Sequence, residues 1–169
     1  MPVFKTRHGL TGTIAAATLA AATLIGASPA GAVTTCTQSC YLDARAGTHT
    51  GFDRLVFDVG GSELPTVQAG ISSTGEYTVG GSGDTKVVQI PGKSYLMLHT
   101  FFSHTTYDDG SRSYTTPTIL PVALPSLKGV QLLSDFEGYT DFGLSLDNCT
   151  SYNVFTLTSP NRIVVDVYH

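Results

Sequence analysis

Two histidines and two aspartates lie close together in one polar stretch and form the cluster best suited to a metal ion: His99, His104, Asp108 and Asp109. A strand does not clearly place both histidines on one face, because they are five positions apart and successive side chains alternate. No glutamate of a zinc protease lies between them. The stretch 108–111 also lacks the alternating acidic positions of a calcium-binding loop. We therefore predict a solvated loop, with no metal and no cofactor.

Four acidic side chains further along the chain could supply the acid and base of a glycosidase: Asp135, Glu137, Asp141 and Asp147. That chemistry needs two carboxyl groups about 5–10 Å apart across a sugar-binding groove. Nothing in the sequence places these residues so, and acidic turn residues are the simpler interpretation. Nucleophile-elbow and phosphate-loop motifs are absent from the sequence. We predict no catalytic residue, and a secreted hydrolase using these carboxylates or the histidines is the alternative.

Aromatic residues recur in a long polar segment that we name the aromatic loop, residues 101–116. Sugar rings have apolar C–H faces and polar rims, so a sugar-binding surface needs aromatic faces beside hydrogen-bonding groups. The candidate ligand-binding residues are Phe101, Phe102, Tyr107, Arg112 and Tyr114. The alternative interpretation is that Phe101 and Phe102 only attach a long loop to the core.

An eight-residue stretch, 52–59, recurs near the C-terminus as 160–167, with arginine, an aliphatic pair, aspartate and valine in the same order. Both stretches alternate as strands do, with apolar residues on one face. The recurrence predicts a domain built from two related halves. Chance similarity between two half-buried strands is the alternative.

The two stretches also suggest a register. If they pair antiparallel with Val56 opposite Val164, the charged residues oppose each other as Arg54 with Asp166 and Asp58 with Arg162. Exposed pairs of this kind contribute only about 0.2–1 kcal/mol each, but they select one register. We interpret these four residues as structural.

Short apolar-alternating stretches separated by Gly, Pro, Asn and Asp turns fill the chain after residue 40, and none has a helical period. This pattern predicts an all-β fold, an antiparallel β-sandwich or flattened barrel of about 8–10 short strands. The segment 118–124 contains Pro121, so we expect an edge strand or connector there. The other expected strands are 41–46, 53–59, 66–72, 76–79, 86–90, 94–100, 127–133, 139–146, 152–158 and 162–168.

The first 32 residues read as a secretory signal peptide. Lys5 and Arg7 precede an uncharged Ala/Thr/Leu-rich run, and Ala30-Gly31-Ala32 resembles a cleavage site. We expect cleavage after Ala32, a short lead-in over 33–40 and one domain over 41–169. The uncharged run is short for a bilayer span, so no stable membrane anchor is expected after cleavage.

The net charge of the mature chain argues against a nucleic-acid partner. The leader holds two of the nine basic residues and none of the thirteen acidic ones, so the mature chain has formal charge 7 − 13 = −6. Nucleic-acid-binding proteins carry basic surfaces, so no nucleic-acid partner is expected.

Export places all three cysteines, Cys36, Cys40 and Cys149, in an oxidising compartment. In an extended strand Cys36 and Cys40 would be about 13 Å apart, too far to bridge, although a turn between them would allow it. Cys40 and Cys149 each precede a strand-like stretch. We favour a Cys40–Cys149 disulfide, which would leave Cys36 as a free thiol.

Several motifs together resemble the AMIN-like domain of secreted actinobacterial proteins, over roughly residues 41–169. They are Gly51 to Val59, Leu132 to Gly138 with its Asp135-Phe136-Glu137-Gly138, Phe142 to Asp147, Val154 to Leu157 and Pro160 to Val167. The family is related to the AMIN domain of cell-wall amidases and secretins. The resemblance implies a β-sandwich of two similar halves with a targeting or peptidoglycan-binding role.

The resemblance carries no binding residues onto this chain. No amidase domain follows residue 169 in the sequence, so we expect a stand-alone module. The leading hypothesis is a secreted or cell-wall-associated, non-enzymatic protein that binds cell-wall glycan or peptidoglycan. A protein–protein interaction module of the envelope, using an exposed sheet edge near Pro121, is the main alternative.

Overall fold

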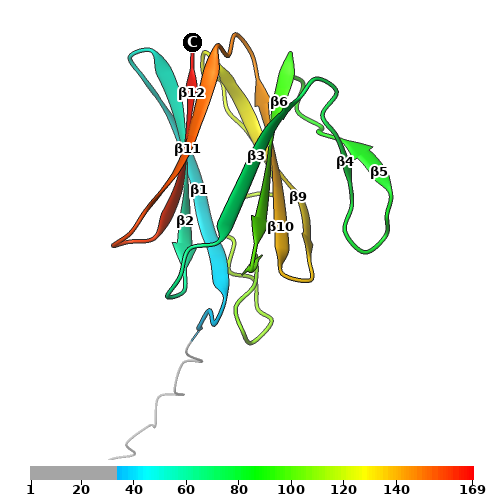
Figure 1. The fold of residues 1–169 in the computed structure, drawn as a ribbon, viewed down its shortest axis with the longest axis vertical. Helices are drawn as coiled ribbons and strands as arrows, with labels where there is room; N and C mark the ends of the chain where they lie inside the picture. Colours follow the sequence, from blue (N-terminus) through cyan, green and yellow to red (C-terminus); the bar gives the residue numbers. More distant parts are fainter. Residues whose placement is uncertain (1–33) are drawn as a thin grey trace, which may run out of the picture. The chain divides into compact units, whose positions relative to one another are not determined.

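The computed structural model describes residues 34–169, which contain strands and turns without a helix. Sheet A has the order β11-β12-β2-β1-β7 and sheet B the order β3-β6-β10-β9-β8, while β4 and β5 form a separate hairpin (Figure 1). The predicted all-β sandwich is confirmed. The bounds are β1 Ser39–His49, β2 Phe52–Gly60, β3 Thr66–Ser72, β4 Glu76–Thr78, β5 Thr85–Val87, β6 Ser94–Phe101, β7 Ser103–His104, β8 Ile119–Pro121, β9 Leu127–Phe136, β10 Tyr139–Leu146, β11 Ser151–Leu157 and β12 Arg162–Tyr168.

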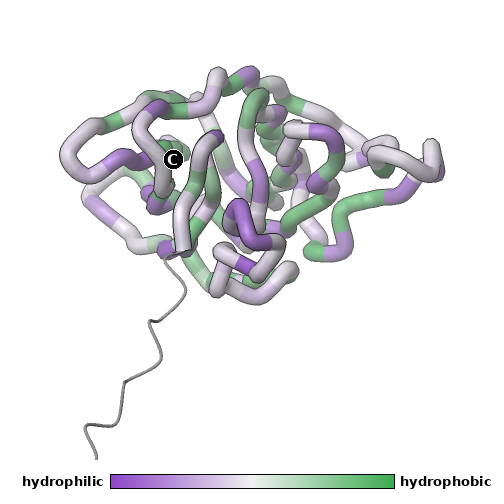
Figure 2. Tube along the Cα trace, turned by 90° about the horizontal axis from the view of Figure 1, so that it is seen from below, coloured by the Kyte–Doolittle hydropathy of each residue, from purple (hydrophilic) through white to green (hydrophobic). Residues whose placement is uncertain are grey.

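Apolar and polar side chains alternate along the strands, and the apolar ones form the core. In β2, Leu55, Phe57 and Val59 are buried, whereas Arg54 and Asp58 are partly exposed, as the sequence predicts. Seen from below, apolar and polar segments alternate along the chain trace (Figure 2). Buried residues from both sheets form one hydrophobic cluster, so the two inner faces share a single core.

The two recurring stretches form neighbouring strands of sheet A in the predicted register. β2 and β12 pair antiparallel with Val56 opposite Val164, Arg54 opposite Asp166 and Asp58 opposite Arg162. Arg54 makes a two-point ion pair with Asp166, with N–O distances of 2.6 and 2.7 Å. The second predicted pair is wrong at the side-chain level. Asp58 binds Arg45 of β1 instead, because β1 flanks β2 on its other side and places Arg45 opposite Val56, diagonal to Asp58. The duplication itself stays a prediction.

Aromatic rings join the inner faces of the two sheets. Tyr41 of β1 packs edge-on against Phe57, Phe142 and Tyr114, with ring centroids 5.3, 4.8 and 6.5 Å away. Tyr41 also donates a hydrogen bond from its hydroxyl to Thr100 of β6, at 3.2 Å. These large side chains fill the core of a protein whose sequence has no tryptophan.

A buried aspartate links one sheet to the other. Asp53 of β2 is fully buried, and its Oδ2 accepts hydrogen bonds from the backbone N–H groups of Ser126 and Leu127, at 2.6 and 2.9 Å. These donors stand at the start of β9, so Asp53 ties sheet A to sheet B where β9 begins.

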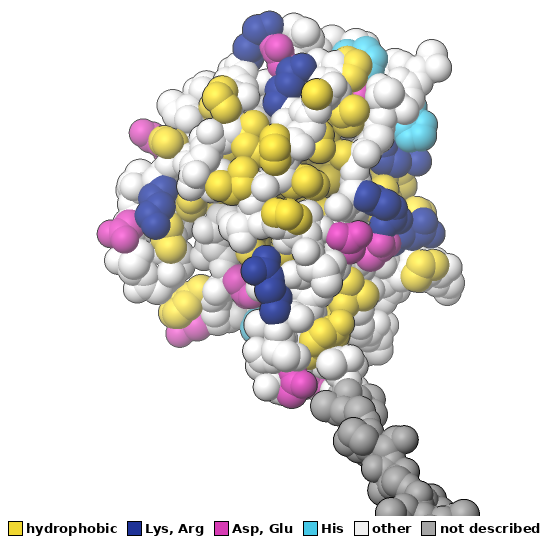
Figure 3. Space-filling view, turned by 180° about the vertical axis from the view of Figure 1, so that it is seen from behind, with side chains coloured by type: hydrophobic (Ala, Val, Ile, Leu, Met, Phe, Trp, Pro, Cys, Tyr) yellow, Lys and Arg dark blue, Asp and Glu magenta, His cyan; other side chains and the backbone are white. Residues whose placement is uncertain are grey.

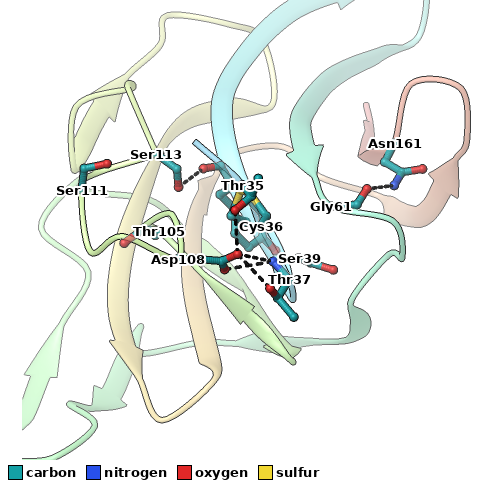
Figure 4. Close-up of a disulfide and its surroundings, with 12 residues drawn as sticks. Thr35, Cys36, Thr37, Ser39, Gly61, Thr105, Asp108, Ser111, Ser113 and Asn161 are labelled. Atoms are coloured by element: carbon teal, nitrogen blue, oxygen red, sulfur yellow. Dashed lines mark hydrogen bonds between the residues drawn. A yellow bond between two sulfur atoms is a disulfide. The ribbon is translucent and has the colours of Figure 1, made fainter. Parts of the chain in front are cut away.

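The favoured Cys40–Cys149 disulfide is wrong. Cys36 and Cys40 form the disulfide, with their Cα atoms 5.8 Å apart, and Cys149 is a free thiol. The chain bends at 37–38 instead of extending, and this brings the two cysteines within bridging distance. Asp108 stabilises the bend, because its carboxylate accepts hydrogen bonds from the backbone N–H and hydroxyl of Thr37 and from the hydroxyl of Thr35 (Figure 4).

The expected signal peptide, 1–32, and the first lead-in residue lie outside the described residues, so cleavage and export stay predictions. The expected strand 86–90 is only partly formed. β5 ends at Val87, and Val88 and Ile90 then lie buried against the outer face of sheet B beside Gly143 and Gly129. Residues 34–169 contain no helix that is long and apolar enough to span a membrane.

Candidate functional site: an aromatic and polar platform

The outer face of sheet B carries two rows of side chains in register across three neighbouring strands. The first row is aromatic, since Phe101 of β6 lies opposite Tyr139 of β10, and Tyr139 lies opposite Phe136 of β9. The second row is polar, since His99 lies opposite Asp141, which lies opposite Ser134. We name these six residues the platform. Period-two alternation places both rows on one face, because members of the two rows are two residues apart in every strand.

The aromatic row offers open ring surface. Tyr139 and Phe136 are 43% and 42% exposed. Phe101 meets Tyr139 edge-on with ring centroids 5.5 Å apart, and His99 lies nearly parallel to Tyr139 at the same distance. Because the rings of His99, Phe101 and Tyr139 restrain one another, this part of the platform presents a preformed apolar surface.

The polar row is a chain of hydrogen-bonding groups. Nδ1 of His99 and the carboxylate of Asp141 share a hydrogen bond. An ionised carboxylate only accepts, so in this pair Nδ1 is the donor, which leaves Nε2 to face other partners. Asp141 stands between His99 and Ser134, whereas a serine hydrolase needs its histidine between serine and aspartate. The row therefore does not form a charge-relay arrangement and serves better as a set of binding groups.

The β4–β5 hairpin forms one wall of the groove over the platform. The backbone N–H of Gly80 donates to Oγ of Ser134, at 3.0 Å. A Cβ atom at Gly80 would lie 2.7 Å from both Ser134 Oγ and Phe136 Cβ, so only glycine permits this approach. The groove has a volume of about 340 Å³, and Thr78 and Gly80 of the hairpin segment line it together with platform residues.

A neighbouring part of the same face is closed. The backbone N–H of Gln89 donates to Oε1 of the buried Gln131, at 2.7 Å, and the hydroxyl of Ser145 donates to the carbonyl of Ile90, at 2.6 Å. This segment covers sheet B beside the platform, and the platform is left open to solvent.

The five candidate residues of the aromatic loop lie in different surroundings and do not form one continuous surface. Phe101 belongs to the platform, whereas Tyr114 is buried in the core, and burial raises the pKa of its hydroxyl to about 12. Arg112 donates to the carbonyl oxygens of Tyr114 and Thr116, at 2.6 and 3.3 Å, and so holds the loop together. Phe102 has a φ of 60°, is 69% exposed and does not line the groove, and Tyr107 is half-buried.

The four histidine and aspartate candidates have separate partners. His99 binds Asp141 in the platform, while His104 contacts Gln38 at 2.8 Å. Hydrogen bonds from Thr37 lower the pKa of Asp108, and those from Ser111 lower the pKa of Asp109. Within residues 34–169 no group of three His, Cys, Asp or Glu side chains could hold a metal ion.

The four glycosidase candidates are also dispersed. Asp135 accepts a hydrogen bond from the backbone N–H of Thr105, at 2.7 Å, and Asp147 forms an ion pair with Lys93, at 2.6 Å. Glu137 sits in the β9–β10 turn with a φ of 50°. Of these four, Asp141 is the carboxylate that lines the groove.

Sequence reasoning did not identify Phe136, Tyr139 or Ser134 as a site. A usable signal was present, because Asp135-Phe136-Glu137-Gly138 predicts a hairpin turn that places Phe136 beside Tyr139. The pairing of this hairpin with β6, about 40 residues earlier in the chain, had no local signal.

Comparison with known proteins gives one match. The profile of a family described as the AMIN-like domain matches residues 40–169, which include every strand of both sheets except the first residue of β1. Neither a curated protein nor a solved structure shows a significant match to the chain.

Proposed function

Because this chain belongs to the AMIN-like domain family, a group of cell-wall-related, non-catalytic modules, we propose that it binds the glycan of cell-wall peptidoglycan through the platform. The observation that carries the proposal is the register of the two rows. An aromatic row directly beside a polar row matches a sugar, whose ring has an apolar face and a rim of hydroxyl and amide groups.

Each row has a distinct part in the proposed complex. A sugar ring would stack on the exposed Tyr139 and Phe136, and aromatic side chains lose little entropy on binding because they have only two side-chain torsions. The carboxylate of Asp141 would accept hydrogen bonds from hydroxyl or amide N–H groups on the rim. Three strands at about 4.8 Å spacing span roughly 10 Å, which suits one ring and its substituents.

A binding assay on purified sacculi tests the proposal. We expect the purified protein to sediment with the sacculi, and Tyr139→Ala to weaken binding at least tenfold by loss of stacking. Asp141→Asn tests the polar row and keeps the shape of the side chain. Phe102→Ala is the matched control, because Phe102 is an exposed aromatic residue outside the groove. Wild-type protein that stays in the supernatant, or equal binding by Tyr139→Ala, would contradict the proposal.

We further propose that the protein is exported and that the signal peptide is removed after Ala32. The family occurs in secreted or envelope proteins, which supports this location. Mass spectrometry of the protein recovered from culture medium or envelope fractions should give an N-terminus at Val33. Recovery of the intact chain in the cytoplasm would contradict export.

A protein partner in the envelope is the second candidate function. Hydrophobic side chains gather across the face seen in Figure 3. β8 is an outer strand of sheet B, and its residue Ile119 is 36% exposed. This function predicts a cross-linked protein partner in envelope extracts that Ile119→Lys removes, while Tyr139→Ala leaves it in place.

A further inference from the structure

The two outermost strands on one side of the sandwich are uncharged. β11 is the outer strand of sheet A and β3 the outer strand of sheet B, each seven residues long. Neither strand contains any of the 13 acidic or nine basic residues of the chain. Natural sheets protect outer strands with charges, prolines, bulges or covering loops, because unpaired backbone N–H and C=O groups bind other strands.

The opposite side has such protection. The aromatic loop runs along β1, where the backbone N–H of Thr115 donates to the carbonyl of Leu42 at 2.8 Å and the N–H of Ala44 donates to Oγ1 of Thr116 at 2.7 Å. β8 has only three residues, one of which is Pro121. Within residues 34–169, β3 and β11 therefore lack the protection that the opposite side of the sandwich has.

The two open strands lie next to each other. The Tyr152 hydroxyl donates to the carbonyl of Ala69, at 3.5 Å, and Ile71 and Tyr152 line a common pocket. Ala69 is the central residue of β3, and Tyr152 is two residues from Val154, the centre of β11. Ile71 is 52% exposed and Leu157 37% exposed, so this side offers apolar contact area beside the outer backbone edges of the two strands.

We propose that a second copy of this chain binds this side, pairing β11 with its own copy and β3 with its own copy. One two-fold axis perpendicular to the sheets produces both pairings, because the centres of the two strands are adjacent. Val154 then lies opposite Val154 of the second copy, and Tyr152 opposite Thr156 of the second copy. In the other sheet Ala69 meets itself and Val67 meets Ile71, so no like charges oppose each other.

The dimer would also bring two platforms together for glycan binding, an inference that rests on the proposed function. A two-fold axis perpendicular to the sheets leaves both platforms on the same outer face of a continuous ten-stranded sheet. Five strand spacings separate the two copies of β10, which is about 24 Å. Two weak sites at this separation on one face would bind a polymeric glycan with avidity, whereas a short oligosaccharide would contact only one of them.

Sedimentation analysis of the purified protein tests the dimer. We expect twice the monomer mass at micromolar concentration, and at least a tenfold increase of the dissociation constant for Ile71→Lys and for Asn153→Lys. Ile119→Lys is the matched control, because it places the same charge at the opposite side and should leave the dimer intact. A wild-type protein that remains monomeric at 100-fold higher concentration would overturn the proposal, whatever the platform variants do in the sacculus assay.

Cysteine cross-linking tests the register. In a Cys149→Ser background, Val154→Cys should form a disulfide-linked dimer under mild oxidation, because residues directly opposite in an antiparallel pair have Cα atoms about 4.5–5.5 Å apart. Thr156→Cys should not, since residue 156 faces residue 152 of the second copy. A dimer that cross-links equally at both positions, or at neither, would exclude this pairing.

Discussion

Arg54 and Asp166 lie directly opposite each other on β2 and β12, and the guanidinium donates two parallel hydrogen bonds to the carboxylate, at 2.6 and 2.7 Å. The Asp166 side chain is 5% exposed and the Arg54 side chain 34%. Arg54 also lies over the ring of Phe52, at 5.1 Å. The pair therefore joins two opposite charges by two parallel hydrogen bonds, with the carboxylate buried, in the middle of sheet A.

Removing Arg54 should destabilise the fold. Arg54→Ala leaves a buried carboxylate without its partner, so we expect a loss of about 2–3 kcal/mol in the free energy of unfolding. The more exposed Arg45–Asp58 pair is the control, and Arg45→Ala should cost less than about 1 kcal/mol. Urea unfolding of both variants measures the difference, and equal losses would contradict this assignment.

Asp53 should contribute more to the free energy of unfolding than the nearby Ser126. Asp53→Ala removes the acceptor of two buried backbone N–H groups, and we expect a loss of about 3 kcal/mol. Ser126→Ala is the control at the same junction, because its buried hydroxyl has no hydrogen-bond partner among the described residues. That variant should change stability by less than about 1 kcal/mol in thermal melts.

Alkaline pH should unfold the protein through its buried tyrosines. Burial raises the pKa of Tyr114 from 10.0 to about 12, so the fold favours the neutral hydroxyl. Its contribution to stability is complete below pH 10 and decreases as the pH rises from 10 towards 12. Tyr114→Phe should reduce this loss in circular-dichroism titrations, whereas the control Tyr107→Phe, a half-buried residue, should leave the profile unchanged.

Acid should release the N-terminal segment that holds the disulfide. Hydrogen bonds from Thr37 lower the pKa of Asp108 below 3.8, so these contacts persist above that pH and are lost as the pH falls through the lowered pKa. Asp108→Ala should produce the same release at neutral pH. Amide hydrogen exchange at Thr37 should become faster in this variant, with Asp109→Ala as the control, because Asp109 binds Ser111 instead.

Local patterns determined the strands and one long-range pairing. Alternation of apolar and polar residues is enough to identify a strand and its buried face, as in β2. The recurring Arg and Asp positions also predicted the register of β2 with β12, across more than 100 residues, because complementary charges select one alignment.

Tertiary structure alone decided the platform and the disulfide. His99, Asp141 and Ser134 meet because β10 lies between β6 and β9, and strand order depends on packing of the whole sandwich. The same holds for Cys36 and Cys40, since the bend between them depends on Asp108, 71 residues after Thr37. A local sequence pattern predicts which face of a strand a residue occupies. Its neighbours on that face depend on the strand order, which is set by the free energy of packing the complete core.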